Sequence, residues 1–160
     1  MSVAKKSNMT SSKKKSEQKS SEFAKLFTAS MREGDKKAMG DSLISSISSY
    51  HEKLSAAHKR GQNFIEVCNP TEKTHGWYGL HTAINIVADD MVFFIDSITA
   101  FVAEKSYLIE QIIHPKMYNI RSKGGKIEYL EKRSAVGKDV SVQTHMYIQL
   151  NRRLTESQMT

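Results

Sequence analysis

Cysteine is nearly absent from this sequence. Its 160 residues include one cysteine, Cys68, together with two prolines and one tryptophan. A single cysteine cannot form an internal disulfide, and it cannot supply the cysteine cluster of a zinc or iron–sulfur site. This composition fits a reducing compartment, so we expect a cytoplasmic protein.

Long apolar runs are also missing. The first residues lack the apolar stretch of a secretory signal. No run approaches the roughly 18 to 20 apolar residues that a helix needs to span a bilayer. We therefore expect a protein that is neither exported nor inserted in a membrane.

The usual catalytic signatures do not occur. The sequence contains no G-x-G-x-x-G, no Walker loop, no H-E-x-x-H and no G-x-S-x-G. These patterns would indicate dinucleotide, phosphate, zinc-protease and hydrolase sites. We expect this chain alone to have no catalytic residues and to bind neither a cofactor nor a metal ion.

Positive charge is concentrated at the N-terminus. The formal charge is +7, but residues 1–21 contain six lysines, seven serines and one glutamate, which leaves 18 basic and 16 acidic residues elsewhere. So polar a segment cannot bury enough apolar surface to offset the entropy of ordering, and we expect it to be disordered. Its lysines allow an alternative function, weak and non-specific nucleic-acid binding.

The segment 22–62 has helical periodicity. Phe23, Leu26, Phe27 and Met31 form one apolar stripe, and Gly34 follows where that helix would end. A second amphipathic helix is predicted to begin near Asp35 or Asp41 and to end before Gly61. His51 and His58 share a face of this helix, where we expect a packed or solvated pair and no metal site.

The segment 63–160 alternates strands with one strongly apolar helix. Phe64 to Cys68 and the stretch from Thr82 to Ala88 are predicted strands, and the second ends at Asp89-Asp90. Either aspartate is expected to cap the following helix, an interpretation more economical than an acid/base cluster with Asp96. The apolar stripe of this helix comprises Met91, Phe94, Ile95, Ile98, Phe101 and Val102.

The remaining residues predict further strands. The stretch from Leu108 to Arg121 is interrupted by His114-Pro115, and Gly124-Gly125 turns the chain into a hairpin with 127–130. From 142 to 150 apolar and polar residues alternate, so we expect one buried face and one that is wet or paired with a partner. Thr155 and Gln158 have the spacing of a capping box, which indicates a helix start.

Three segments of this region, taken in order, indicate a family. They are "FIEVCNP" from Phe64, "HTAINIVADDMVFFIDSITAFV" from His81 and "LIEQIIHPKMYNIRSKGGKI" from Leu108. Their order resembles the N-terminal ACT-like region of the large bacterial NAD-specific glutamate dehydrogenases, and the likeness covers most of residues 22–152. One departure is Val92, which stands where the family usually has a proline at the first turn of the helix.

This resemblance implies an α+β fold, in which N-terminal helices precede an incomplete ACT-like antiparallel sheet of the ferredoxin-like βαββαβ type. One main helix packs on the sheet, and the second helix and last strand are expected past Thr160. The implied organisation is a tail at 1–21, a helical segment at 22–62 and the ACT-like sandwich at 63–160. The parent enzymes oxidatively deaminate glutamate to 2-oxoglutarate with NAD, in a domain far beyond this region.

The implied function is that of a non-catalytic regulatory or assembly module. ACT domains bind amino acids between protomers and bias the conformation of a larger enzyme. By this resemblance Asp89, Asp90 and His114 are the candidate contacts for an amino-acid effector. The expected partners are a second copy of the chain or a dehydrogenase polypeptide, because a sheet face without its second helix exposes apolar surface.

The first prediction separates the module function from nucleic-acid binding. Deleting residues 1–21 removes six of the lysines, so it is expected to abolish any binding of duplex DNA and to leave effector binding intact. Fluorescence anisotropy in low and high salt measures the first property, and calorimetry measures the second. Undiminished DNA binding by the shortened chain would contradict this division.

Overall fold

The computed structural model describes residues 21–121, 126–130 and 140–159. Most of the tail predicted to be disordered, residues 1–20, lies outside this range, and Ser21 serves as the N-cap of the first helix. The elements, in chain order, are α1 Glu22–Thr28, α2 Glu33–Met39, α3 Asp41–Ala57, β1 Phe64–Cys68, α4 Glu72–His75, β2 Ala83–Asp89, α5 Phe94–Glu104, β3 Ile109–Ile113, β4 Lys116–Arg121, β5 Ile127–Leu130, β6 Val140–Leu150 and the short 3-10 turn η1 Glu156–Gln158.

A six-stranded antiparallel sheet forms the centre of the molecule. Its order is β1-β2-β6-β4-β5, and β3 pairs with the same long strand, β6, as β4 does. The interruption between β3 and β4 falls at His114-Pro115, as predicted, and the Pro115 carbonyl accepts a hydrogen bond from the His145 amide. The predicted hairpin of β4 and β5 is confirmed, and the α+β fold is consistent with an ACT-like domain.

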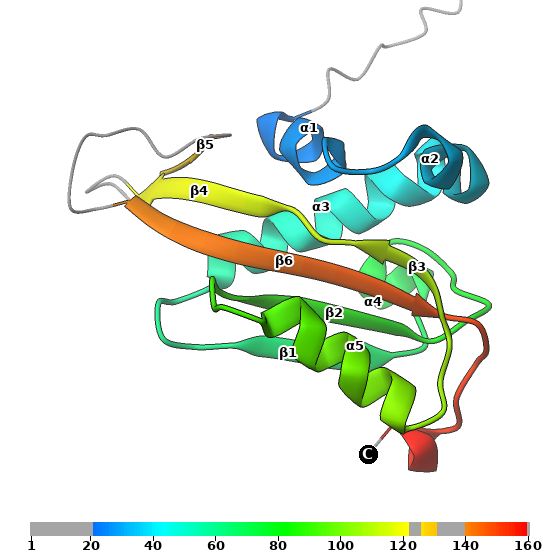
Figure 1. The fold of residues 1–160 in the computed structure, drawn as a ribbon. Helices are drawn as coiled ribbons and strands as arrows, with labels where there is room; N and C mark the ends of the chain where they lie inside the picture. Colours follow the sequence, from blue (N-terminus) through cyan, green and yellow to red (C-terminus); the bar gives the residue numbers. More distant parts are fainter. Residues whose placement is uncertain (1–20, 122–125, 131–139, 160) are drawn as a thin grey trace, which may run out of the picture.

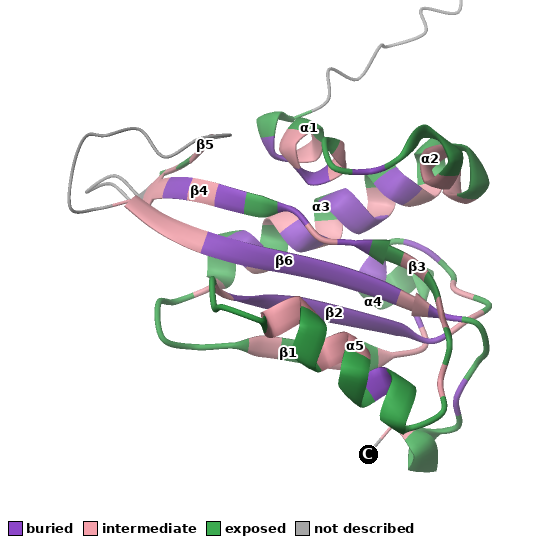
Figure 2. Ribbon diagram, viewed as in Figure 1, coloured by how far each residue is buried: buried purple, intermediate pink, exposed green. Residues whose placement is uncertain are grey.

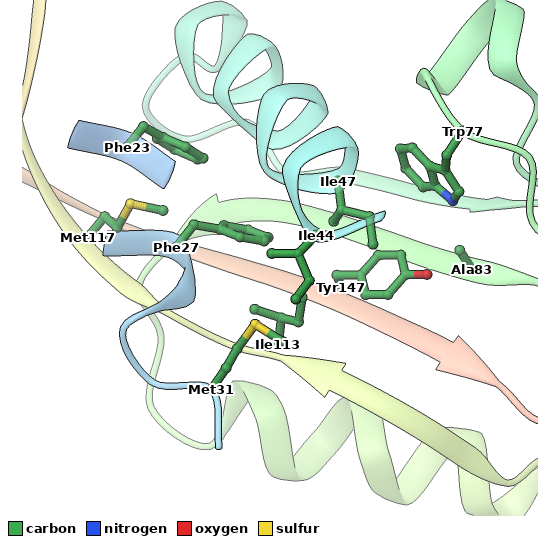
Figure 3. Packing of buried hydrophobic residues seen from close by; sticks show 10 residues of the cluster. All are labelled: Phe23, Phe27, Met31, Ile44, Ile47, Trp77, Ala83, Ile113, Met117 and Tyr147. Carbon is green, nitrogen blue, oxygen red and sulfur yellow. The ribbon is translucent and has the colours of Figure 1, made fainter. Parts of the chain in front are cut away.

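Helices cover both faces of this sheet (Figure 1). Helices α1 to α3 lie on one side and α5 on the other, so the strongest apolar helix of the sequence does pack across the strands. On the α5 side, Val102 and its neighbours pack against a cluster that comprises Ile84, Ile86, Ala88, Met146, Ile148, Leu150 and Leu154. On the α3 side, the buried cluster comprises Phe23, Phe27, Met31, Ile44, Ile47, Trp77, Ala83, Ile113, Met117 and Tyr147, as Figure 3 shows.

Both faces of β6 are buried, which corrects the expectation that one of them would be wet or paired with a partner. No side chain from Gln143 to Ile148 is more than 3% exposed. Figure 2 shows β2 buried along almost its whole length and β6 buried over its central part, with an intermediate stretch at its start. The alternation of β6 is therefore between an apolar face under α5 and a polar face under the N-terminal helices.

The predicted start of α5 is wrong. This helix begins at Phe94, its N-cap is Phe93, and no side chain provides a capping hydrogen bond. Asp90 still belongs to the sheet, because its amide donates to the Val142 carbonyl at 3.1 Å. Phe93 then takes a left-handed conformation with φ of 60°, which breaks the helical path between the aspartates and Phe94.

The N-terminal helices also differ in detail from the prediction. Helix α1 ends at Thr28, and Gly34 lies inside α2, which has no buried residue. The two predicted starts of the second helix, Asp35 and Asp41, belong to separate helices, α2 and α3, and the single turn α4 was not predicted. Among the described residues, no helix combines the length and apolarity needed to cross a membrane.

The second prediction compares two phenylalanines. Phe27 is fully buried between α1 and the sheet, whereas Phe101 on α5 is 57% exposed. Phe27→Ala is expected to lower the free energy of unfolding by about 3–5 kcal/mol, because it leaves a cavity in the core. Phe101→Ala serves as the control and is expected to change it by about 0.5 kcal/mol or less. Urea unfolding followed by circular dichroism measures both, and equal losses would contradict the packing described.

Candidate functional site

The candidate effector contacts fall on two faces of the sheet. Asp89 points toward the end of α3, where its Oδ2 accepts a hydrogen bond from the Gly61 amide at 2.7 Å. Asp90 points to the opposite face and accepts from Thr144 Oγ1 at 2.9 Å. Successive residues of a strand alternate between faces, so the two neighbouring aspartates cannot act on the same small ligand.

Asp90 and His114 belong to one cluster beside the start of α5. Lys116 Nζ lies 3.2 Å from Asp90 Oδ2, so the carboxylate already has a cationic partner. Burial lowers the pKa of His114, the charge of Lys116 lowers it further, and the charge of Asp90 opposes both effects. The Lys116–Asp90 ion pair therefore joins the start of β4 to the loop that leads into α5.

Asp89 borders a cavity of about 520 Å³ at the C-terminal end of α3. His58 Nε2 lies 3.8 Å from Asp89 Oδ1, beyond hydrogen-bond distance. The cavity wall comprises Ala56, Ala57, His58, Lys59, Arg60, Asp89, Asn119, Val140, Ser141 and Gln143. The helical segment thus meets the sheet in a polar hollow that contains groups of both charge signs.

One buried donor in this hollow has no partner among the described residues. Asn119 is 4% exposed, and its Nδ2 makes no hydrogen bond within that part of the chain. Its Oδ1 is occupied, because Ser141 Oγ donates to it. A buried amide N–H without an acceptor costs free energy, so an acceptor brought by a ligand would be favoured here.

A buried polar network joins α3 to the sheet. His51 Nδ1 on α3 lies 3.3 Å from His145 Nδ1 on β6. His51 Nε2 faces Asn85 Oδ1 at 3.3 Å, and His145 Nε2 faces Gln143 Oε1 at the same distance. Ser55 Oγ on α3 also donates to Gln143 Oε1, at 2.6 Å. Both imidazoles are fully buried, so the network lies in the dry interior.

One contact of this network, between the two Nδ1 atoms, has no hydrogen to share when both rings are neutral. Asn85 and Gln143 present their oxygens to the two rings, so each Nε2 has to carry its hydrogen. In neutral rings both Nδ1 atoms are then bare and face each other. An added proton would bridge them, but burial lowers the pKa of His51 to about 4 and that of His145 well below its usual value. The pair is therefore neutral at pH 7.

Aromatic rings keep this network dry. The Phe23 ring stands edge-on to His145 with centroids 5.3 Å apart, and the Phe27 ring lies 5.0 Å from that of His51. Sequence reasoning placed His51 as a packed or solvated residue but did not connect it to His145, 94 positions away. The available signal was that Asn85 stands between Ile84 and Ile86 and that His145 precedes Met146, each within a predicted strand.

A second group of residues resembles a metal centre. Ligand atoms of Glu66, Cys68 and His75 all lie within 4.8 Å of one another. Such a nitrogen, sulfur and oxygen set is of the type that binds zinc, which needs a thiolate and an unprotonated imidazole nitrogen. Burial and the neighbouring charge of Glu66 raise the pKa of the Cys68 thiol to about 12, so the thiol is protonated.

The hydrogen bonds of His75 also disfavour metal coordination. Its Nδ1 accepts from the Thr71 amide at 3.1 Å, so the neutral ring carries its proton on Nε2. That nitrogen lies 3.5 Å from Glu66 Oε1, and Tyr50 Oη and Asn85 Nδ2 each donate to Glu66 Oε2 at 3.0 Å. The cluster is therefore organised by contacts to the Glu66 carboxyl group, and a metal ion would have to displace the His75 proton.

Comparison with known proteins identifies the family of this chain. The family model described as "Glutamate dehydrogenase, ACT1 domain" matches residues 23–160. The chain therefore belongs to the family of glutamate dehydrogenase ACT1 domains. A curated relative is the NAD-specific glutamate dehydrogenase of Pseudomonas aeruginosa strain PAO1, with 30% identity over 93 residues.

That match covers 58% of this chain and 6% of the relative. The chain therefore corresponds to a small part of a much longer protein. No solved structure gives a significant match. The resemblance stated from the sequence is confirmed at the level of the family, whereas the activity of the long relative remains a statement about that protein.

The third prediction concerns pH. The pKa of His51 lies below its ordinary value of 6.5 because the side chain is buried. Below pH 6.5 the unfolded chain therefore binds a proton at this residue that the folded chain does not bind. Stability is thus expected to be level above pH 6.5 and to fall as the pH drops from 6.5 toward 4. With His145 shifted in the same direction, the loss between pH 7.5 and 5.5 is about 2–3 kcal/mol.

Urea unfolding at a series of pH values measures this slope. His51→Gln is expected to flatten it, whatever the change in stability at pH 7.5. His81→Gln is the matched control, since His81 is partly exposed and pairs with Glu110 at 2.7 Å. If His51→Gln left the pH dependence of the unfolding free energy unchanged, groups other than His51 would be responsible for the loss of stability in acid.

Proposed function

We propose that this chain is a non-catalytic regulatory and assembly module that acts on an NAD-specific glutamate dehydrogenase polypeptide in the cytoplasm. The observation that carries the proposal is the family match over residues 23–160, which includes all but two of the residues that the structure describes. The parent reaction, oxidative deamination of glutamate to 2-oxoglutarate, belongs in this proposal to the partner polypeptide. The module has two tasks, to dock on that polypeptide and to sense a small effector.

The docking surface that supports this proposal lies on the α5 side of the sheet. Ile65 and Val67 on β1 are 56% and 37% exposed, although their register partners Ile86 and Ile84 are covered by α5. Phe101 on α5 is also exposed, and it lines the same hollow as Val67. A contiguous apolar strip of this kind marks a protein contact, and we propose that the dehydrogenase polypeptide or a second copy covers it.

The loop before α5 extends this surface. Met91, Val92 and Phe93 are 44%, 82% and 73% exposed, and Phe93 is the residue with the left-handed backbone. A non-glycine residue in this conformation costs about 1 kcal/mol or more, so the loop is held in place by the strand before it and the helix after it. In the proposed assembly its apolar side chains enter the contact with the partner.

The regulatory task is assigned to the cavity beside Asp89. There the end of α3 meets β2, β4 and β6, so a ligand would contact both the helical layer and the sheet. A ligand that binds one relative placement of these layers more tightly shifts the population toward it. The docking surface lies on the opposite face of the same sheet, on β1 and α5, and β1 pairs with β2, which carries Asp89.

The fourth prediction tests the assembly. Replacing both Ile65 and Phe101 by aspartate removes apolar contact area and adds charge, so it is expected to weaken association with the dehydrogenase polypeptide about tenfold or more. Leu80→Asp is the control, because Leu80 is an even more exposed apolar residue but lies in the loop between α4 and β2. Light scattering and a pull-down with the dehydrogenase polypeptide from the same organism measure association.

Activity assays complete this test. NAD reduction with glutamate is expected to be absent with the chain alone and to change when the chain is added to the dehydrogenase polypeptide. A chain that remains monomeric at tens of micromolar, with and without that polypeptide, would overturn the proposed function.

A further inference from the structure

We propose that a hollow beside the last turn of α5, here called the α5 hollow, binds a small apolar carboxylate such as a medium-chain fatty acid. The hollow has a volume of about 310 Å³ and is lined by residues of α5, of strands β1, β2 and β6, and of η1. This is a different place from the cavity beside Asp89, which lies under α3. Ligand binding in the α5 hollow does not rest on the proposed function, whereas its effect on docking does.

The α5 hollow forms because α5 covers only part of its face of the sheet. The helix packs over β2 and β6, and β1 is an edge strand that pairs with β2 alone. The helix ends at Glu104, and Ser106 then takes a left-handed conformation with φ of 58°. The short turn η1 lies beside this end of the helix, as Figure 1 shows, and Met159 after it packs against the same core. A space is thus left between the helix, the edge strand and η1.

The interior of the α5 hollow is apolar. Ile84, Val102 and Leu150 are buried residues of its wall. Val67 and Phe101 also line it, but they are 37% and 57% exposed. An alkyl chain in the hollow would remove the exposed apolar surface of these two side chains from water together with its own, which favours binding.

Two cationic side chains lie at the rim. Lys105 lines the hollow, and its Nζ lies 5.3 Å from the centroid of the Phe101 ring. Tyr107 lines it as well, and Arg152 Cζ lies 4.9 Å from the centroid of that ring. Within the described part of the chain neither cation forms an ion pair, and no acidic side chain lines the hollow.

An apolar interior with a cationic rim complements a ligand that has one apolar and one negative end. A carboxylate gains charge-assisted hydrogen bonds from an ammonium or guanidinium group. A free amino acid does not fit this pattern, because its own ammonium group would lie against the two cations of the rim. A volume of about 310 Å³ is at the small end of ligand sites, so the fitting carboxylates are short.

The α5 hollow overlaps the proposed docking surface, since Val67 and Phe101 belong to both. A ligand that covers these side chains and a partner that contacts them exclude each other. By linkage, each lowers the affinity of the chain for the other. In this proposal an apolar carboxylate therefore weakens the association with the dehydrogenase polypeptide.

The fifth prediction uses equilibrium dialysis of the full chain with radiolabelled octanoate. Octanoate is expected to bind with a dissociation constant of about 1 mM or below. Hexanoate is expected to bind about tenfold more weakly, because it buries two fewer methylene groups. Octanol lacks the charge and octylammonium reverses it, so each is expected to compete with octanoate at least about tenfold less well than unlabelled octanoate does.

Four variants locate the site. Val67→Phe fills the α5 hollow and is expected to weaken octanoate binding about tenfold or more. Ile65→Phe is its matched control, because Ile65 lies on the same face of β1 but outside the wall of the hollow. Arg152→Gln is expected to weaken octanoate binding and to leave octanol binding unchanged. Its control is Arg153→Gln, because Arg153 lies over Tyr78, away from the hollow.

Thermal melting shows whether each variant is folded. Arg152 is an exposed side chain, so the test does not depend on the stability of Val67→Phe. Three results would overturn the inference: no bound octanoate at about 10 mM, tenfold above the expected constant; equal competition by octylammonium; or equal effects of Val67→Phe and Ile65→Phe.

A pull-down with the dehydrogenase polypeptide in the presence of octanoate tests the effect on docking. Less polypeptide is expected to be recovered, and undiminished recovery at saturating octanoate would contradict the competition. If octanoate does not bind but Val67→Phe weakens the association, the hollow holds a side chain of the partner and the inference is wrong. If octanoate binds and the polypeptide never associates, the ligand site stands and the proposed function fails.

Discussion

The N-terminal helices cover the polar face of β6, so each buried polar side chain on that face needs a hydrogen-bond partner. The placement of the neighbouring elements follows from this constraint. His145 and Gln143 cannot reach water, so α3 presents His51 and Ser55 to them, and β2 adds Asn85. A buried network of this kind fixes one placement of the helix, because an apolar interface would tolerate sliding and this one does not. The aromatic rings of α1 then close the site.

The two faces of the sheet consequently have different characters. Under α5 the contacts are apolar and non-directional, and the strip beside the helix is left uncovered at Ile65 and Val67. Under α3 the contacts are directional, and the polar interface opens at its end into the cavity beside Asp89. A module that docks on one face and senses a ligand on the other would need this division.

Hydrophobic periodicity predicted β1 and the helix on the sheet, and the His114-Pro115 and Gly124-Gly125 pairs predicted the interruption and the hairpin. It could not predict which neighbour covers the polar face of β6, because alternation identifies two faces but not their environments. The capping role of the aspartates failed because Phe93 takes a conformation that no pattern indicates. Of the candidate site, only Asp89 lies in the cavity. Arg60 and Asn119 come from distant segments, which only the tertiary structure brings together.

The interruption at Pro115 has a consequence for how the sheet edge comes apart. Because β3 and β4 are separate strands on one continuous partner, the edge of β6 is held by two short ladders and not by one long one. The β3–β6 or the β4–β6 ladder can open from its own end while the other keeps its hydrogen bonds. The Pro115 carbonyl lies at the boundary between the two ladders. Local opening at the β5 hairpin therefore need not spread to Ile113, whose side chain anchors the far half of the edge in the core.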